Sequence, residues 1–176
     1  MKHRTSFVVC VVLAASVLAT AEESKEAEIK RAMSAGPPSI AKDAKIMDAD
    51  DKGNMVTLRD GNNGWVCMPG HPDHVGDVAM CVDGPAMQWA QDWLAHKEKP
   101  TNTQPGIMYM LAGGSDWSAT DPWATSGTPI KEPPHWMIMW PFDPKTSGLP
   151  TEPKQTGTWI MWAGTPYAHL MINQKP

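Results

Sequence analysis

Methionine and histidine alternate along two short apolar segments of this chain. His135, Met137 and Met139 are spaced two apart, and so are His169 and Met171. Side chains two apart on a β-strand share one face of the sheet, so each segment presents its histidine and methionines together. Thioethers favour Cu(I), and imidazole accepts either oxidation state of copper. The pattern therefore predicts a copper site built from these five residues.

Methionine also fills irregular protein cores, where its flexible thioether packs well against large aromatic rings. The chain has 13 Met and 9 Trp but only 2 Phe and 2 Tyr, so methionine must supply much of the apolar filling. Core packing is the simpler explanation of the methionines. Copper is the specific ligand to test against it.

A second group of residues has the composition of a ligand platform. Trp117 and Trp123 lie among turn-forming residues, close to Asp116 and Asp121. Exposed indoles can stack on a sugar or another flat ligand while carboxylates orient it. The simpler alternative is that both tryptophans anchor a long loop to the body of the protein, since exposed tryptophan is uncommon.

Two cysteines, Cys67 and Cys81, follow the first 21 residues. In an oxidising compartment such an isolated pair predicts a disulfide across a loop rich in turn formers. The alternative is a metal site that adds His71 and His74. Those residue types suit zinc, but their spacing differs from that of the common zinc motifs.

Catalytic motifs are missing from the sequence. G-x-S-x-G, H-E-x-x-H and the P-loop do not occur, so no catalytic residue is assigned. We therefore expect non-enzymatic binding of a small ligand or metal. A structural or partner-binding secreted protein is the main alternative, and a small hydrolase-like enzyme is the third.

The elements that must position these residues are short. Apolar segments flanked by Gly, Pro, Asn or Asp predict strands at residues 44–49, 54–59, 65–67, 107–113, 135–140, 159–164 and 167–172. Residues 86–96 predict an amphipathic helix, with Trp89, Trp93 and Leu94 on its apolar side and Asp92 on its polar side. Residues 116–134 and 142–157 are expected to be long Pro-rich loops. The pattern favours an α+β fold, with a mostly antiparallel sheet and one packed helix.

Residues 1–21 have the composition of a secretory signal. A basic start precedes a short apolar stretch, and Ala-Thr-Ala at residues 19–21 is an A-x-A cleavage pattern. We expect residues 22–37 to be helical or flexible and residues 38–176 to form one globular domain. The product is expected to be secreted or periplasmic, with no membrane span after cleavage.

Charge narrows the range of partners. Loss of Lys2 and Arg4 with the signal changes the formal net charge from −4 to −6. An acidic chain without a Lys/Arg cluster is a poor match for nucleic acid. A small ligand or a protein partner is therefore expected.

Several short stretches resemble, as a set, an uncharacterised group of exported bacterial proteins without an assigned activity. They are Asn63-Gly64-Trp65, Cys67-Met68-Pro69, Met80-Cys81-Val82-Asp83, Met87-Gln88-Trp89-Ala90, Tyr109-Met110-Leu111, Gly113-Gly114-Ser115-Asp116, Met161-Trp162-Ala163-Gly164-Thr165-Pro166-Tyr167 and His169-Leu170-Met171. The resemblance covers most of the chain from residue 38 onward. It implies one exported domain and transfers no site residue.

Overall fold

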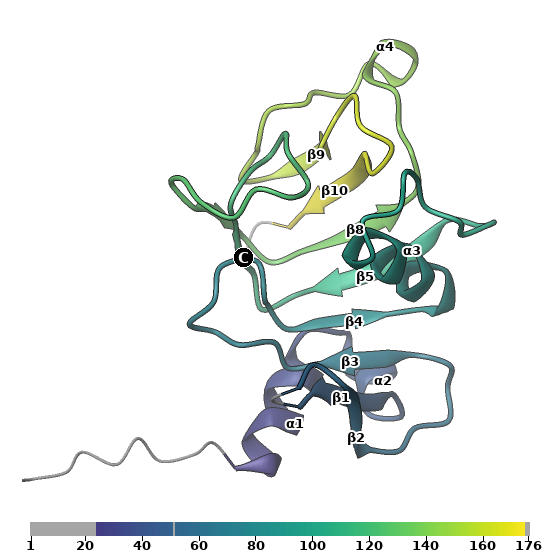
Figure 1. The fold of residues 1–176 in the computed structure, drawn as a ribbon, viewed down its shortest axis with the longest axis vertical. Helices are drawn as coiled ribbons and strands as arrows, with labels where there is room; N and C mark the ends of the chain where they lie inside the picture. Colours follow the sequence, from purple (N-terminus) through teal and green to yellow (C-terminus); the bar gives the residue numbers. More distant parts are fainter. Residues whose placement is uncertain (1–23, 51, 175–176) are drawn as a thin grey trace, which may run out of the picture.

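The computed structural model describes residues 24–50 and 52–174, and the expected signal at residues 1–21 lies outside this range. One eight-stranded sheet forms the body of the molecule (Figure 1). Its strands, in spatial order, are β2 (Met55–Arg59), β1 (Lys45–Ala49), β3 (Val66–Met68), β4 (Met80–Val82), β5 (Gly106–Met110), β8 (His135–Met139), β10 (His169–Asn173) and β9 (Gly157–Met161). Strands β6 (Gly114–Asp116) and β7 (Ile130–Glu132) pair separately, and the helices are α1 (Lys25–Ser34), α2 (Pro38–Ala41), α3 (Gly84–Leu94) and α4 (Pro144–Ser147).

Every neighbouring pair in the large sheet is antiparallel except β1 with β3. This confirms the expected α+β domain with a mostly antiparallel sheet. Three strands were not predicted as such: β4, β6 and β7. Each has only three residues. β7 lies inside residues 116–134, which were expected to be a loop, so that expectation was wrong there; neither β6 nor β7 carries an apolar run that marks a strand.

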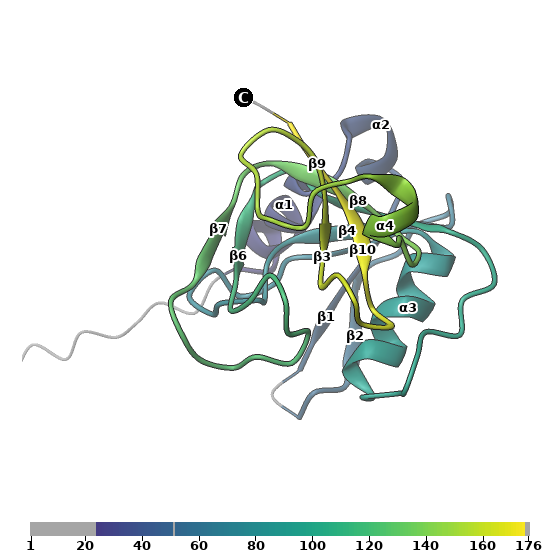
Figure 2. The same cartoon turned by 90° about the horizontal axis from the view of Figure 1, so that it is seen from above.

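The two faces of the sheet are covered by different helices. On one face, Ala32 and Ala35 of α1 and its C-cap pack against Ile46, Cys67 and Cys81. On the other face, α3 packs Ala86 and Trp89 against the strands from β4 to β9. Figure 2 shows α1 and α3 on opposite sides of the sheet.

Helix α3 begins where the sequence favours it. Asp83 is its N-cap, and the Asp83 carboxylate accepts a hydrogen bond from the Ala86 amide at 2.9 Å. The expected orientation of its last turn was wrong: Asp92 is buried, and Leu94 is 68% exposed. The Asp92 carboxylate accepts hydrogen bonds from Gln88 Nε2 and from the amide and hydroxyl of Thr101.

Through these contacts Asp92 links α3 to the segment that leads to β5. Burial raises the pKa of the Asp92 carboxyl, but hydrogen bonds from Lys97, Thr101 and Gln88 outweigh it and lower the pKa to about 2. A buried carboxylate with this many donors keeps its charge. Helical periodicity alone could not show that the polar side of the last turn would face inward.

None of the helices in the described part of the chain has the length and apolar character that a membrane crossing needs.

The predicted disulfide joins neighbouring strands. Cys67 of β3 and Cys81 of β4 are directly opposite one another, with a Cα–Cα distance of 4.0 Å, and both side chains are fully buried. The bond closes the base of the segment between these strands, which has few apolar side chains of its own to hold it.

We predict that the double variant Cys67→Ala/Cys81→Ala lowers the free energy of unfolding by about 3 kcal/mol, because it frees the unfolded chain from a closed loop. Urea unfolding of the variant and of the oxidised wild type measures the difference. Reduced wild type should match the variant, and an unchanged urea midpoint in both would contradict the prediction.

Candidate functional site

Methionines gather on the face of the sheet that α3 covers. Cross-strand pairing places Met108 beside Met137 and Met137 beside Met171, and it places Met68 beside Met80. Residues that pair directly across strands point to the same face of the sheet, and so do residues two apart on one strand. Eight methionines therefore share this face: Met68, Met80, Met108, Met110, Met137, Met139, Met161 and Met171.

The alternation predicted for residues 135–139 is present in β8, where His135, Met137 and Met139 are buried and the two residues between them are less so. His169 and Met171 of β10 are buried on the same face. The structure thus places all five residues of the predicted copper set on one buried surface.

The two histidines of that set lie at opposite ends of it. His135 pairs with Asn173, and the next same-face pair is Met137 with Met171. Continued by two residues, the same register brings Met139 beside His169. The backbone positions of the two histidines are therefore separated by roughly 13 Å along the strands, at about 3.3 Å per residue.

His169 has a methionine on each side. It pairs directly with Met161 of β9, and the β8–β10 register places Met139 on its other side. Side chains in such neighbouring positions have Cβ atoms about 5 Å apart. Met161 was not in the set predicted from the sequence. Two signals in the sequence could have indicated Met161. It is two residues from Trp159 and so shares its face of β9, and the short segment from β9 to β10 favours pairing of these two strands.

The hydrogen bonding of His169 leaves one ring nitrogen available. Its Nδ1 lies 3.0 Å from the Tyr167 carbonyl oxygen, which can only accept, so Nδ1 carries the proton and Nε2 keeps its lone pair. Burial lowers the pKa of the imidazole to about 4, so the ring is neutral at pH 7. A ring nitrogen bonded to a carbonyl is the usual arrangement behind a metal-binding histidine.

Indole rings enclose His169. Trp89 and Trp162 stack nearly parallel, with ring centroids 6.0 Å apart, and each meets the imidazole edge-on at 5.3 and 5.0 Å. Trp162 has a left-handed backbone with φ of 54°, which is uncommon for a large side chain. Two hydrogen bonds hold it there: its amide donates to Ala119 O and its Nε1 to Ser118 O.

His135 has different neighbours from those of His169. Its Nδ1 lies 2.8 Å from the Pro133 carbonyl oxygen, while its buried Nε2 has no hydrogen-bond partner and lies 3.9 Å from Glu132 Oε2. Burial lowers the pKa of His135, and burial together with nearby Asp116 raises the pKa of Glu132 to about 8. At neutral pH a neutral imidazole therefore faces a mostly protonated carboxyl.

A small cavity of about 70 Å³ lies between this face and α3. His169, Met137, Met139 and Met161 line one part of it, and Glu132 with Asp116 lines another. This volume can hold a metal ion or a few waters but is well below the roughly 300 Å³ of a small organic ligand site. The arrangement offers soft, uncharged ligand atoms, thioethers and an imidazole, that are themselves buried.

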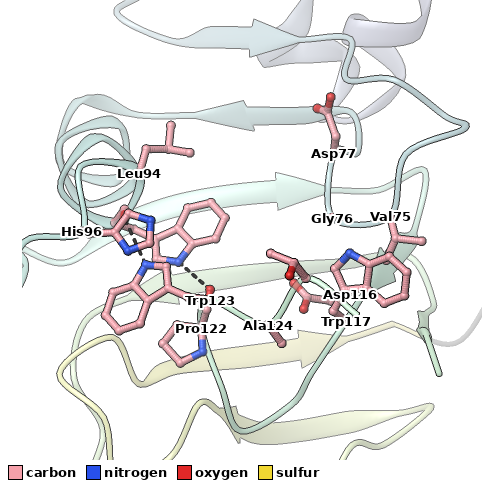
Figure 3. Close-up of a pocket in the computed structure, with 12 residues that line it drawn as sticks. Val75, Gly76, Asp77, Leu94, His96, Asp116, Trp117, Pro122, Trp123 and Ala124 are labelled. Carbon is pink, nitrogen blue, oxygen red and sulfur yellow. Dashed lines mark hydrogen bonds between the residues drawn. The ribbon is translucent and has the colours of Figure 1, made fainter. Parts of the chain in front are cut away.

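The predicted ligand platform lies elsewhere, at a surface cleft of about 300 Å³ (Figure 3). Trp117, Trp123 and Asp116 line it, together with His96 of the turn after α3. Asp121 does not line the cleft; it accepts a hydrogen bond from the Trp123 amide at 3.0 Å.

Trp123 makes contacts that fix its loop to α3. Its ring stacks on His96 at 5.2 Å, and its Nε1 donates to Trp93 O, while Trp93 Nε1 donates to Pro122 O (Figure 3). One face of this indole is therefore already covered. Trp93, Trp117 and Trp123 all line the cleft. Of these three indoles, Trp117 is the one that makes no aromatic ring contact within the described residues.

Comparison with protein-family models, curated proteins and solved structures finds no match to this chain.

We predict that Glu132→Gln removes part of the pH dependence of stability. The folded pKa of Glu132 is about 8, well above the ordinary value of 4.5, so the folded state keeps a proton that the unfolded state releases. Its contribution is fully present below about pH 4.5 and is lost as pH rises through 8, at up to about 1.4 kcal/mol per pH unit.

Urea unfolding of both proteins between pH 5 and 8 tests this. The stability of wild type should fall relative to that of Glu132→Gln across this window, and the amide should be the more stable side chain at pH 8. A constant difference between the two proteins would show that Glu132 titrates normally.

Proposed function

We propose that this protein is exported and binds monovalent copper in the buried space around His169. The ligands are His169 Nε2 and the sulfurs of Met139 and Met161. The observation that carries the proposal is the position of His169 between two methionines in one row of the sheet, with its Nδ1 already bonded to a carbonyl.

Charge selects Cu(I) over divalent ions at this site. The three ligand groups are neutral, and burial raises the pKa of Glu132, which lines the same cavity, to about 8, so this carboxyl is mostly protonated at pH 7. Burying an ion without a compensating charge costs free energy, and that cost rises with the square of the ionic charge. A neutral set of thioethers and imidazole therefore suits a soft monovalent ion.

The surroundings protect such an ion. Met139 and Met161 are 1% and 3% exposed, and the indoles of Trp89 and Trp162 cover the imidazole. A buried set of thioether and imidazole ligands hinders oxidation to Cu(II), which prefers more ligands and a tetragonal geometry. The Cys67–Cys81 disulfide supports an oxidising compartment, and thioether and imidazole ligands cannot be lost there to disulfide formation.

We predict that purified protein binds one Cu(I) with a Kd below about 1 µM. Competition against a chromophoric Cu(I) chelator, without oxygen, measures the affinity. Met139→Leu/Met161→Leu should weaken binding by about a hundredfold, because leucine keeps most of the volume but removes both sulfurs. Quenching of tryptophan emission should accompany binding in wild type and be lost in the variant.

Met47→Leu is the matched control, since Met47 lies on β1 at the far end of the sheet. Circular dichroism and urea unfolding should show that all three proteins are folded. Affinity equal in wild type and Met139→Leu/Met161→Leu, or binding weaker than about 1 µM in wild type, would reject the proposal.

A further inference from the structure

The structure assigns a second metal site, at the surface, to His71, His74 and Asp77 in the segment that the disulfide closes. We propose that it binds a divalent cation of the zinc type. It is independent of the copper proposal, because it uses other residues and an ion of different charge.

The three side chains converge closely. One ligand atom from each of them lies within 4.8 Å of the other two. A hydrogen bond of 2.6 Å joins His71 Nδ1 to Asp77 Oδ2, and a cation would replace the proton that they share. The two imidazole rings have centroids 5.5 Å apart. Two imidazoles and one carboxylate are a common set of protein ligands for Zn²⁺, and a fourth position stays open to solvent.

Backbone hydrogen bonds bring these residues together. The His74 amide donates to His71 O, and the Asp77 amide donates to His74 O, which makes two consecutive turns. The His71 amide then donates to Asp77 O at 2.9 Å and closes the ring. These backbone hydrogen bonds therefore bring every third residue of the segment, His71, His74 and Asp77, to the same side without a metal.

The base of this segment is held on several sides. Arg31 of α1 donates to Pro69 O and Gly70 O at 3.0 Å each, and the Gly76 amide donates to Ser115 O of β6. Gly70 has φ of 56°, and a Cβ there would come within 2.5 Å of the Val78 backbone. Because the loop is already ordered, binding a cation costs little further conformational entropy.

Charge and exposure distinguish this cluster from the buried site. His71 and Asp77 are 49% and 45% exposed. Asp77, Asp48 and Arg31 are the charged groups that act on His71, and two carboxylates against one guanidinium leave a net negative charge. Asp77 also lines the surface cleft, but its carboxylate points away from Trp117 (Figure 3). An accessible, anionic site suits a hydrated divalent ion, whereas the neutral interior does not.

Titration of the full protein with Zn²⁺, followed by calorimetry, tests this inference. We expect one site in wild type and a loss of affinity of at least about tenfold in His74→Ala and in Asp77→Asn. His96→Asn is the matched control, because His96 is an exposed histidine outside the cluster and asparagine tolerates its left-handed backbone. Circular dichroism should show that each variant keeps the wild-type fold.

Spectra give a readout that does not depend on affinity. Co²⁺ should produce visible absorption bands in wild type that are lost in His74→Ala. Met139→Leu/Met161→Leu should bind Zn²⁺ as wild type does, so failure of either site is seen separately. Equal Zn²⁺ affinity in wild type, His74→Ala and Asp77→Asn would overturn the assignment, and so would the absence of Zn²⁺ binding in wild type.

Discussion

The register of β8, β10 and β9 is the constraint on which the rest of the site depends. Because these strands pair antiparallel, His169 lies in one row with Met139 and Met161, and their side chains must all point toward α3. A shift of one residue in any of these strands would turn its sulfur or imidazole to the opposite face. Strand pairing therefore brings the three proposed ligands together, and α3 then covers them.

Several polar atoms buried on this face of the sheet or beside it are left without a hydrogen-bond partner. Five buried side-chain atoms of the described residues have no hydrogen-bond partner: Trp89 Nε1, Trp159 Nε1, Glu132 Oε1, His135 Nε2 and Asn173 Oδ1. All five belong to residues on this face or beside it. The left-handed Trp162 belongs to the same cluster. A core built only for stability would avoid such groups, which is an argument for a functional interior.

Much of the fold follows from local sequence. Short apolar segments between turn formers mark most of the strands, and the alternation in His135–Met139 indicates its buried face. The disulfide follows from two isolated cysteines. Strand order does not follow, because nothing local says that β5 pairs with β8 or that β9 follows β10 at the edge. For that reason the sequence groups His135 with His169, whereas pairing separates them and supplies Met161 instead.

The central claim is that one Cu(I) is held by His169, Met139 and Met161. X-ray absorption spectroscopy of the protein loaded with one equivalent of Cu(I) tests the claim most directly, because it identifies the atoms bound to the metal. The account predicts sulfur and nitrogen neighbours in a ratio of two to one, with the sulfur contribution lost in Met139→Leu/Met161→Leu. A spectrum with nitrogen and oxygen neighbours alone, or one unchanged in that variant, would contradict it.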